Sequence, residues 1–139
     1  MDGGADTGSL IAQRAVPFPD GIDTIAAETL TARAGAALLA DWLAGGKTVG
    51  PPLPAQQTSR QPAPDAAARV IPHTWPVRRA FNFIRGAQAW GPFEVETGEG
   101  RLTVHDAVAM DEAAFLGARH RTSGADVLVQ FADGVLLAR

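Results

Sequence analysis

The chain has 139 residues, enough for one ordinary domain or for a small domain with a piece of another. Fifteen acidic side chains against twelve basic ones give a formal net charge of −3, which argues against a general attraction to nucleic acid or anionic membranes. The sequence contains no cysteine, no secretory leader and no apolar run of about eighteen residues, so we expect a cytoplasmic protein without disulfides, thiolate chemistry or a membrane span.

The first eight residues, M-D-G-G-A-D-T-G, are polar and rich in glycine. Such a segment either lets the backbone approach a ligand closely or forms a frayed terminus. Residues 9–18 then predict a β-strand with Leu10, Ile11 and Val16 as its apolar positions. With no strand before it, this strand would have an unpaired edge, which is a liability in an isolated protein.

A helix is expected at residues 24–44, where Asp23 is a good amino-terminal cap and Gly45 and Gly46 favour its end. Its apolar residues follow helical spacing and form a face too broad to remain exposed to water. Gly35 inside the helix costs about 1 kcal/mol relative to alanine, and either a close approach to a sheet or neutral drift would explain it. One preceding strand is not enough to cover this helix.

Residues 47–68 are rich in proline and glutamine and predict an extended linker between two regions, 1–46 and 69–139. A second helix is expected after the linker, with Thr74 as its cap and Gly86 as its stop. Its apolar side chains fall at positions i, i+3, i+4 and i+7 and form one stripe: Val77, Ala80, Phe81 and Ile84.

The rest of the sequence predicts short strands that this second helix would cover. Residues 93–97 alternate between apolar and acidic side chains, as a half-buried strand does. The other expected elements are a strand at 101–110 with Leu102, Val104 and Val108 facing inward, a loop or short helix at 111–124, and strands at 127–131 and 135–138. The last two strands flank Asp133-Gly134, a pair typical of tight hairpins.

Together these elements predict an α+β protein. Four or five short antiparallel strands and one leading helix match a small, partly open β-barrel of the oligonucleotide/oligosaccharide-binding (OB) type in residues 69–139. A simple α+β sheet is the competing interpretation.

Residue types alone reveal no self-contained active site. The three histidines do not have the spacing of metal ligands, so no metal site is expected. Arg78, Arg79 and Arg85 share the second helix and either form a basic face or solvate its outer surface. The cluster Arg119-His120-Arg121 either contacts a phosphate or belongs to a solvated surface loop.

Several motifs occur in a fixed order along nearly the whole chain: D-x-G-x-D-T-G-x-L-I-x-Q, an Asp-Thr capped helix, a Pro/Gln linker, and W-P-x-x-x-A-x-x-x-I-R-G-x-x-x-W-G-P-F. They are carried by Asp6-Thr7-Gly8, Ile11, Gln13, Asp23-Thr24, Leu30, Gln56 or Gln57, Trp75, Ala80, Ile84-Arg85-Gly86, Trp90 and the late Gly134-Val135-Leu136. In this order the chain resembles the carboxy-terminal half of methionyl-tRNA formyltransferase.

The resemblance implies transfer of a formyl group from 10-formyltetrahydrofolate to an amine. It implies that residues 1–46 are the terminal strand and helix of a formyltransferase α/β domain. Asp6 would hold a histidine and a water during proton movement, and Gly3, Gly4 and Ala5 would line the folate site. The trailing barrel would help to hold tRNA. The candidate contacts to the acceptor or its RNA are Arg78, Arg85, Arg119 and Arg121.

The catalytic Asn and His of that family, and the nucleotide-fold region that carries them, have no counterpart in this sequence. We therefore expect the chain alone to be inactive and to need a missing N-terminal formyltransferase half or self-association. The segment A-W-G-P-F replaces the family's P-W-P-G-A, and residues 69–139 have no net charge, so an amino sugar is an alternative acceptor, as in sugar N-formyltransferases. Two further hypotheses are a non-enzymatic module that binds RNA or protein through the barrel, and an inactive remnant.

Overall fold

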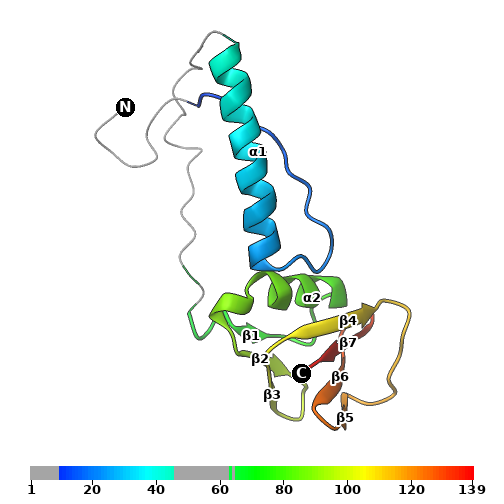
Figure 1. Ribbon diagram of the computed structural model, residues 1–139. Coiled ribbons are helices and arrows are strands. Elements are labelled where there is room, and N and C mark those ends of the chain that lie inside the picture. Colours follow the sequence, from blue (N-terminus) through cyan, green and yellow to red (C-terminus); the bar gives the residue numbers. More distant parts are fainter. Residues whose placement is uncertain (1–9, 46–62, 64) are drawn as a thin grey trace. The chain divides into compact units, whose positions relative to one another are not determined.

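The computed structural model of the chain describes residues 10–45, 63 and 65–139 (Figure 1). The chain divides into two compact units. The first unit comprises Met1–Pro17 and Glu28–Pro62, and the second unit comprises Phe18–Ala27 and Ala63–Arg139. Most of the linker predicted at 47–68 lies outside the described residues.

Helix α1 spans Thr24–Ala44, as the sequence predicts. Asp23 is its cap, because Asp23 Oδ1 accepts a hydrogen bond of 2.8 Å from the backbone N–H of Ala26. None of its residues is buried by the described part of the chain, and the side chains of Leu39 and Leu43 are 54% and 50% exposed. The apolar face expected from helical spacing is therefore only partly covered within the described ranges: Leu30 is exposed, while Ala34, Leu38 and Trp42 are half-buried.

The prediction of a strand at residues 9–18 is wrong. Residues 10–18, the described part of this segment, form no strand. A strand needs a neighbour to pair its backbone N–H and C=O groups, and neither described sheet includes this segment. Leu10 and Ile11 are exposed in consequence. Within the first unit, an exposed ion pair of 3.3 Å joins Arg14 to Asp41, and pairs of this kind stabilise a protein only slightly.

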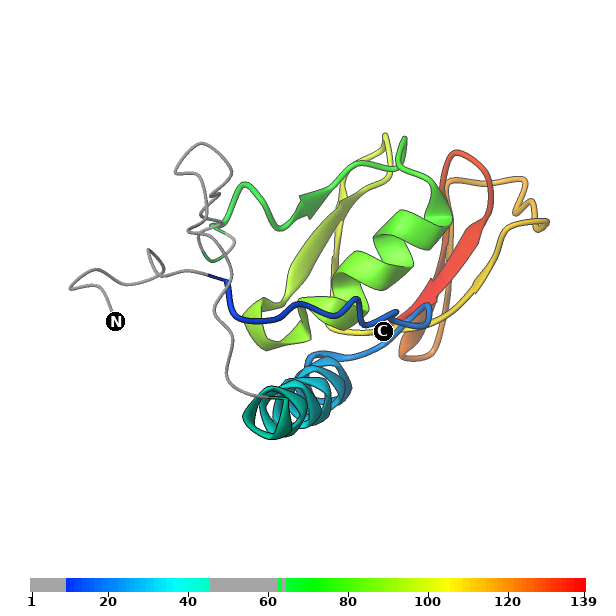
Figure 2. The ribbon, with the colours of Figure 1, turned by 90° about the horizontal axis from the view of Figure 1, so that it is seen from above.

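The second unit contains helix α2 (Val77–Gly86), a 3-10 turn η2 (Gln88–Trp90) and two small sheets. One sheet has the order β1-β2-β3, formed by Val70–Ile71, Phe93–Glu96 and Arg101–Val104. In it, β1 is parallel to β2 and β2 is antiparallel to β3. The other sheet is antiparallel, with the order β4-β7-β6-β5, formed by Ala107–Asp111, Val135–Ala138, Asp126–Gln130 and His120–Ser123. Figure 2 shows α2 lying across the strands.

This architecture confirms the predicted α+β class. The two sheets form no closed barrel within the described residues. In those same ranges, neither α1 nor α2 has both the length and the apolar character that crossing a bilayer requires.

The core of the second unit lies between α2 and the sheets. The predicted apolar stripe of α2 supplies Val77, Ala80 and Ile84, which are fully buried, while Phe81 is partly buried. The inward-facing side chains of β2, Phe93 and Val95, are also fully buried, as the alternation of residues 93–97 predicts. Burial of these side chains is the main contribution to the stability of the unit.

The single strand predicted at residues 101–110 is wrong, because β3 and β4 belong to different sheets. The chain turns at His105 and Asp106, whose backbone N–H groups both donate to the carbonyl oxygen of Arg139, at 2.6 and 2.9 Å. A register shift follows in β4, so Ala107 is buried and Val108 is 37% exposed. Val108 therefore does not face inward as predicted.

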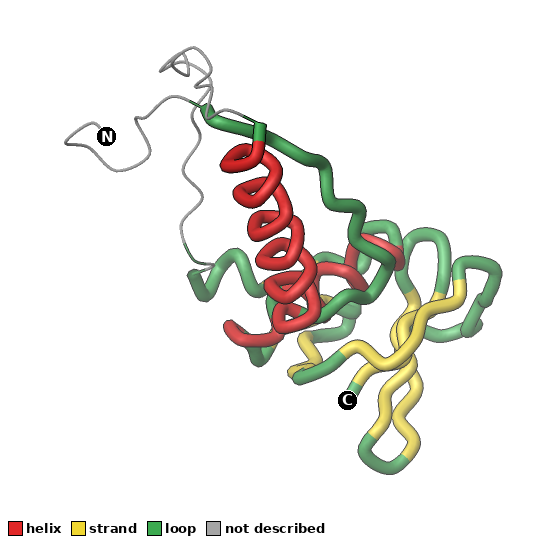
Figure 3. Tube along the Cα trace, turned by 45° about the horizontal axis from the view of Figure 1, so that its top comes forward, coloured by secondary structure: helices red, strands yellow, loops and turns green. Residues whose placement is uncertain are grey.

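Residues 111–124 also differ from the prediction of a loop or short helix, because they include strand β5 (Figure 3). The sequence H-R-T-S of β5 has no apolar alternation, so periodicity gives no signal for it. The hairpin predicted around Asp133-Gly134 is confirmed: β6 and β7 flank it, and the N–H of Phe131 donates to the carbonyl of Gly134 at 2.9 Å.

The end of α2 agrees with the prediction, since the helix stops at Gly86. Its predicted cap is wrong. The helix begins after Pro76, and the N–H of Val77 donates to Asp133 Oδ1 at 2.7 Å, so a residue of the β6–β7 turn takes the place expected for Thr74. A cap supplied from a distant part of the chain leaves no local sequence pattern.

Candidate functional site

The predicted catalytic and folate residues, Asp6, Gly3, Gly4 and Ala5, lie outside the described residues. The four arginines predicted to contact the acceptor are described, and all belong to the second unit. Arg78 and Arg85 lie on α2, whereas Arg119 and Arg121 lie at β5. In the described ranges, no group of three or more His, Asp or Glu side chains could hold a metal ion.

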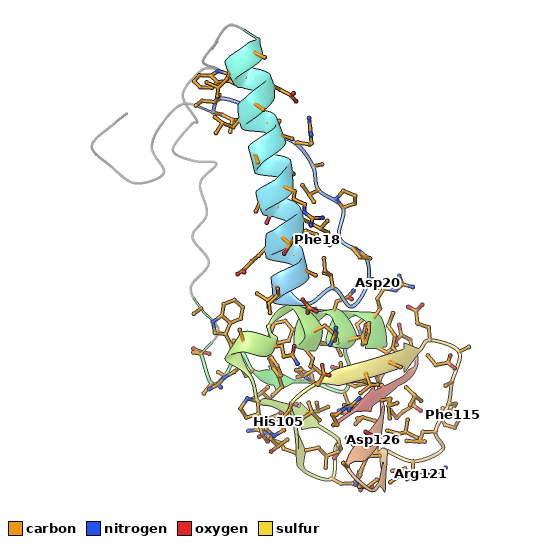
Figure 4. The ribbon with its side chains drawn as sticks, in the orientation of Figure 1. Phe18, Asp20, His105, Phe115, Arg121 and Asp126 are labelled. Carbon is orange, nitrogen blue, oxygen red and sulfur yellow. The ribbon has the colours of Figure 1, made fainter. Side chains whose placement is uncertain are left out.

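Arg78 is held by carboxylates from two distant parts of the second unit. Its Nε and Nη2 donate to the two oxygens of Glu112 at 3.0 and 2.7 Å, which is a bidentate pair. Its Nη1 donates to Asp20 Oδ2. The guanidinium therefore bridges the loop after β4 and the turn before α1, where Asp20 lies beside α2 (Figure 4).

The pairing changes the protonation equilibria of both partners. The hydrogen bond with Glu112, together with the charge of Asp20, raises the pKa of Arg78 above its already high ordinary value. The hydrogen bond from Arg78 lowers the pKa of Glu112. Both groups remain charged at neutral pH. Because both side chains are about half exposed, solvent screens the pair and its contribution to stability is modest.

Arg85, two turns further along α2, has a similar arrangement. Its Nη1 donates to Asp106 Oδ1 at 3.1 Å, and its Nε donates to the carbonyl oxygen of Gly21 at 3.0 Å. Its Nη2 lies 3.7 Å from Asp23 Oδ2. Like Arg78, it connects a fixed carboxylate near the sheets to the segment that precedes α1.

Between these arginines, Asn82 binds the same segment through both ends of its amide. Asn82 Oδ1 accepts a hydrogen bond of 2.6 Å from the N–H of Gly21, and its Nδ2 donates to Asp20 Oδ1 at 2.8 Å. Thr24 adds a fourth attachment, because its hydroxyl donates to the carbonyl oxygen of Gly86 at 2.8 Å. Residues 18–27, referred to below as the clasp, are thus bound to α2 by several polar contacts.

The arginines at β5 differ from those of α2 in their exposure and in their partners. Arg119 and Arg121 are exposed, and neither is paired with a carboxylate in the described part of the chain. Between them, His120 Nδ1 lies 4.0 Å from Glu99 Oε2, which is too far for a hydrogen bond. Of the two groups, these cations are the ones available to an external anion.

Phe115 lies close to this second group, in the loop before β5 (Figure 4). Its side chain is 84% exposed and borders two open hollows. A hollow of about 270 Å³ lies against apolar side chains of the four-stranded sheet, among them Leu128 and Leu137. Another, of about 320 Å³, is lined by Glu99 and Arg119.

The structure therefore separates the predicted acceptor contacts into two groups. α2 packs on β4 and β7, and β5 is the edge strand at the other end of that sheet from β4. The α2 arginines are bound by Asp20, Asp106 and Glu112, which the sequence analysis did not identify as partners. No local pattern could have found them, because 58, 21 and 34 residues separate these pairs along the chain.

No known protein family matches this sequence, and no curated protein matches it. The resemblance to formyltransferases therefore depends on the order and spacing of its motifs.

Proposed function

We propose that this chain is the carboxy-terminal portion of a 10-formyltetrahydrofolate-dependent formyltransferase resembling methionyl-tRNA formyltransferase, and that alone it transfers no formyl group. In this proposal, residues 1–46 are the end of the catalytic domain, 47–68 are a linker, and 69–139 derive from the family's OB-like domain. Asp6 would be the catalytic aspartate that holds a histidine and a water, next to a folate site at Gly3, Gly4 and Ala5.

One structural observation supports an incomplete catalytic region. Helix α1 has 21 residues, and the described chain buries none of them. The segment before it has strand-like apolar residues but pairs with no strand in the described part of the chain. Apolar side chains stay uncovered when the sheet that would cover them belongs to another chain. The exposed apolar residues of α1 and of the segment before it fit this situation.

The chemistry of the predicted site explains the expected inactivity. Proton transfer from an attacking amine requires a base placed within hydrogen-bond distance of it. In the family that this chain resembles, Asp6 would act through a histidine and beside an asparagine, and both are missing from the matching motifs. A carboxylate without them cannot organise the transfer.

The proposal is tested with the purified full chain, 10-formyltetrahydrofolate, and either methionyl-tRNA or an amino sugar as acceptor. We expect no formylated product from the chain alone. We expect product when an Asn- and His-bearing N-terminal formyltransferase half is added to this chain, and none when that half is added to this chain carrying Asp6→Asn. Turnover by the chain alone, or no turnover in any combination, would contradict the proposal.

Association with that half provides a second measurement. Replacing Leu39 and Leu43 by aspartate should reduce co-purification, because the uncovered face of α1 would carry charge into the contact. The matched control is Arg121→Ala, which changes an exposed side chain of the second unit. Equal loss in both variants would argue against α1 as the contact.

A second candidate function is RNA binding at β5, supported by Arg119 and Arg121, which have no carboxylate partner among the described residues and lie beside the exposed ring of Phe115. Exposed arginines bind phosphates, and an exposed aromatic ring stacks on an unpaired base. The charge of the second unit opposes this function, because it has eight arginines and no lysine against eleven acidic side chains.

RNA binding is measured by titrating labelled tRNA at low and at high salt. The double variant Arg119→Ala/Arg121→Ala should weaken binding and reduce its salt dependence. The variant Arg79→Ala is the control, because it removes one positive charge at a distance from β5. A flat titration at low salt would eliminate this candidate.

A further inference from the structure

The clasp is bound to α2 by side-chain and backbone contacts between segments that are far apart in the sequence. Its contacts to Arg78, Asn82 and Arg85 join residues 58 to 64 positions apart in the sequence. The clasp and the rest of the second unit are connected only through residues 28–62. The attachment is therefore made by recognition between side chains and backbone, and not by close connection along the chain.

On the α2 side of this contact, both arginines also bind carboxylates that do not belong to the clasp. Glu112 binds two N–H groups of Arg78, and Asp106 binds one of Arg85, and both carboxylates belong to the segment from the β3–β4 turn to the loop after β4. Each guanidinium is thereby oriented with a further N–H directed at the clasp. A surface whose side chains are already oriented loses less conformational entropy when its ligand binds.

The residues of the clasp fit α2 in shape as well as in charge. Gly21 has φ of +71°, and a Cβ atom on it would lie 2.6 Å from Cζ of Phe81, so only glycine allows the backbone to approach this ring. The two neighbouring acidic residues then reach Arg78 and Arg85, and Thr24 reaches the last carbonyl group of α2.

We propose that the α2 face formed by Arg78, Asn82 and Arg85 is a preformed binding site for an acidic turn of sequence Asp-Gly-x-Asp-Thr, and that residues 20–24 of this chain occupy it. The site does not depend on which chain supplies the turn. When its own clasp is displaced, the second unit keeps an intact site for the same turn from a peptide or a second copy. This recognition is independent of formyl transfer.

The test uses the full chain and a labelled peptide of residues 18–27, F-P-D-G-I-D-T-I-A-A. The variant Gly21→Val should displace the chain's own clasp, and amide exchange at residues 20–24 should become at least about tenfold faster. The peptide should then bind this variant at least about tenfold more tightly than it binds the unchanged chain, whose site is occupied. Adding Arg78→Gln to the variant should abolish the gain.

The controls separate recognition from unfolding. A peptide with both aspartates replaced by asparagine should bind at least about tenfold more weakly. If Gly21→Val does not fold, the full-chain variant Asp20→Asn/Asp23→Asn replaces it, since asparagine at position 23 still caps α1. Faster exchange without peptide binding, or unchanged exchange in the clasp variant, would overturn the proposal.

Discussion

Asp133 Oδ1 accepts a hydrogen bond of 2.7 Å from the backbone N–H of Val77, so the turn between β6 and β7 caps the first residue of α2. The two residues are 56 positions apart. This contact satisfies an N–H that has no partner inside the helix, and it fixes the hairpin against the helix that covers the core. Asp133 is therefore both a residue of the β6–β7 turn and the cap of α2.

Replacing Asp133 by alanine should lower the free energy of unfolding by about 1 kcal/mol, because the Val77 N–H loses its acceptor. Asp133→Asn keeps an acceptor oxygen and should lose less. Urea unfolding followed by tryptophan fluorescence measures both changes. Equal effects of the two substitutions would show that the charge, and not the cap, is what matters.

Gly134 should be sensitive to any side chain. A Cβ atom at this position would lie 2.7 Å from Val77 Cγ1 and 2.8 Å from Glu112 Cα, and the latter is backbone that cannot easily move. We expect Gly134→Ala to cost about 1–3 kcal/mol in thermal or urea unfolding. Gly100→Ala is the control, because a Cβ there meets no atom within 4 Å. It should change stability by about 0.5 kcal/mol or less.

The position of Val108 can be tested against that of Ile84. Ile84, on the core-facing side of α2, is fully buried, so Ile84→Ala should cost about 2–5 kcal/mol through lost burial and the resulting cavity. Val108 is 37% exposed, and Val108→Ala should cost less than about 1 kcal/mol. Similar losses in chemical unfolding would mean that Val108 faces the core after all.

The pair between Glu112 and Arg78 predicts a small acid-dependent loss of stability. The pKa of Glu112 is lowered in the folded chain, so below the ordinary glutamate value of about 4.3 the unfolded chain binds more protons than the folded one. The contribution is complete above about pH 5 and disappears as the pH falls through the lowered pKa.

Unfolding curves of the original chain and of Glu112→Gln, collected from neutral to acid pH, should therefore differ at neutral pH and converge in acid. Glu28→Gln, at an exposed glutamate of α1, serves as the control and should keep the full pH dependence. A constant difference between the chain and Glu112→Gln at all pH values would contradict the sign of this effect.

Gly35 lies in the middle of α1, and a Cβ atom there meets nothing within 4 Å in the described structure. Gly35→Ala should therefore increase the helicity of the isolated chain, measured by far-ultraviolet circular dichroism, with a gain of about 1 kcal/mol for the helix. If a sheet from an N-terminal half approaches α1 closely at this glycine, the same variant should bind that half more weakly. Unchanged binding would remove the packing explanation for the glycine.

Regular local patterns predicted much of the second unit. The stripe of α2, the alternation of β2 and the Asp133-Gly134 hairpin are all found, because each is set by periodicity or by turn chemistry within a few residues. The predictions failed where a partner was needed. Residues 10–18 have strand-like side chains, but no strand of the described ranges pairs with them. Strand β5 forms through pairing with β6 although its side chains are polar.

The contacts of the arginines also divide into those that a local pattern predicts and those that depend on distant residues. The sequence alone determined that Arg78, Arg79 and Arg85 share the second helix and lie off its apolar stripe. Only the tertiary structure decided that Arg78 and Arg85 hold the clasp, and that the two arginines at β5 have no carboxylate partner within the described residues. The physical reason is that hydrogen bonds and ion pairs act over a few ångströms in space, and the chain brings Asp20 and Arg78 together from positions that no sequence period connects.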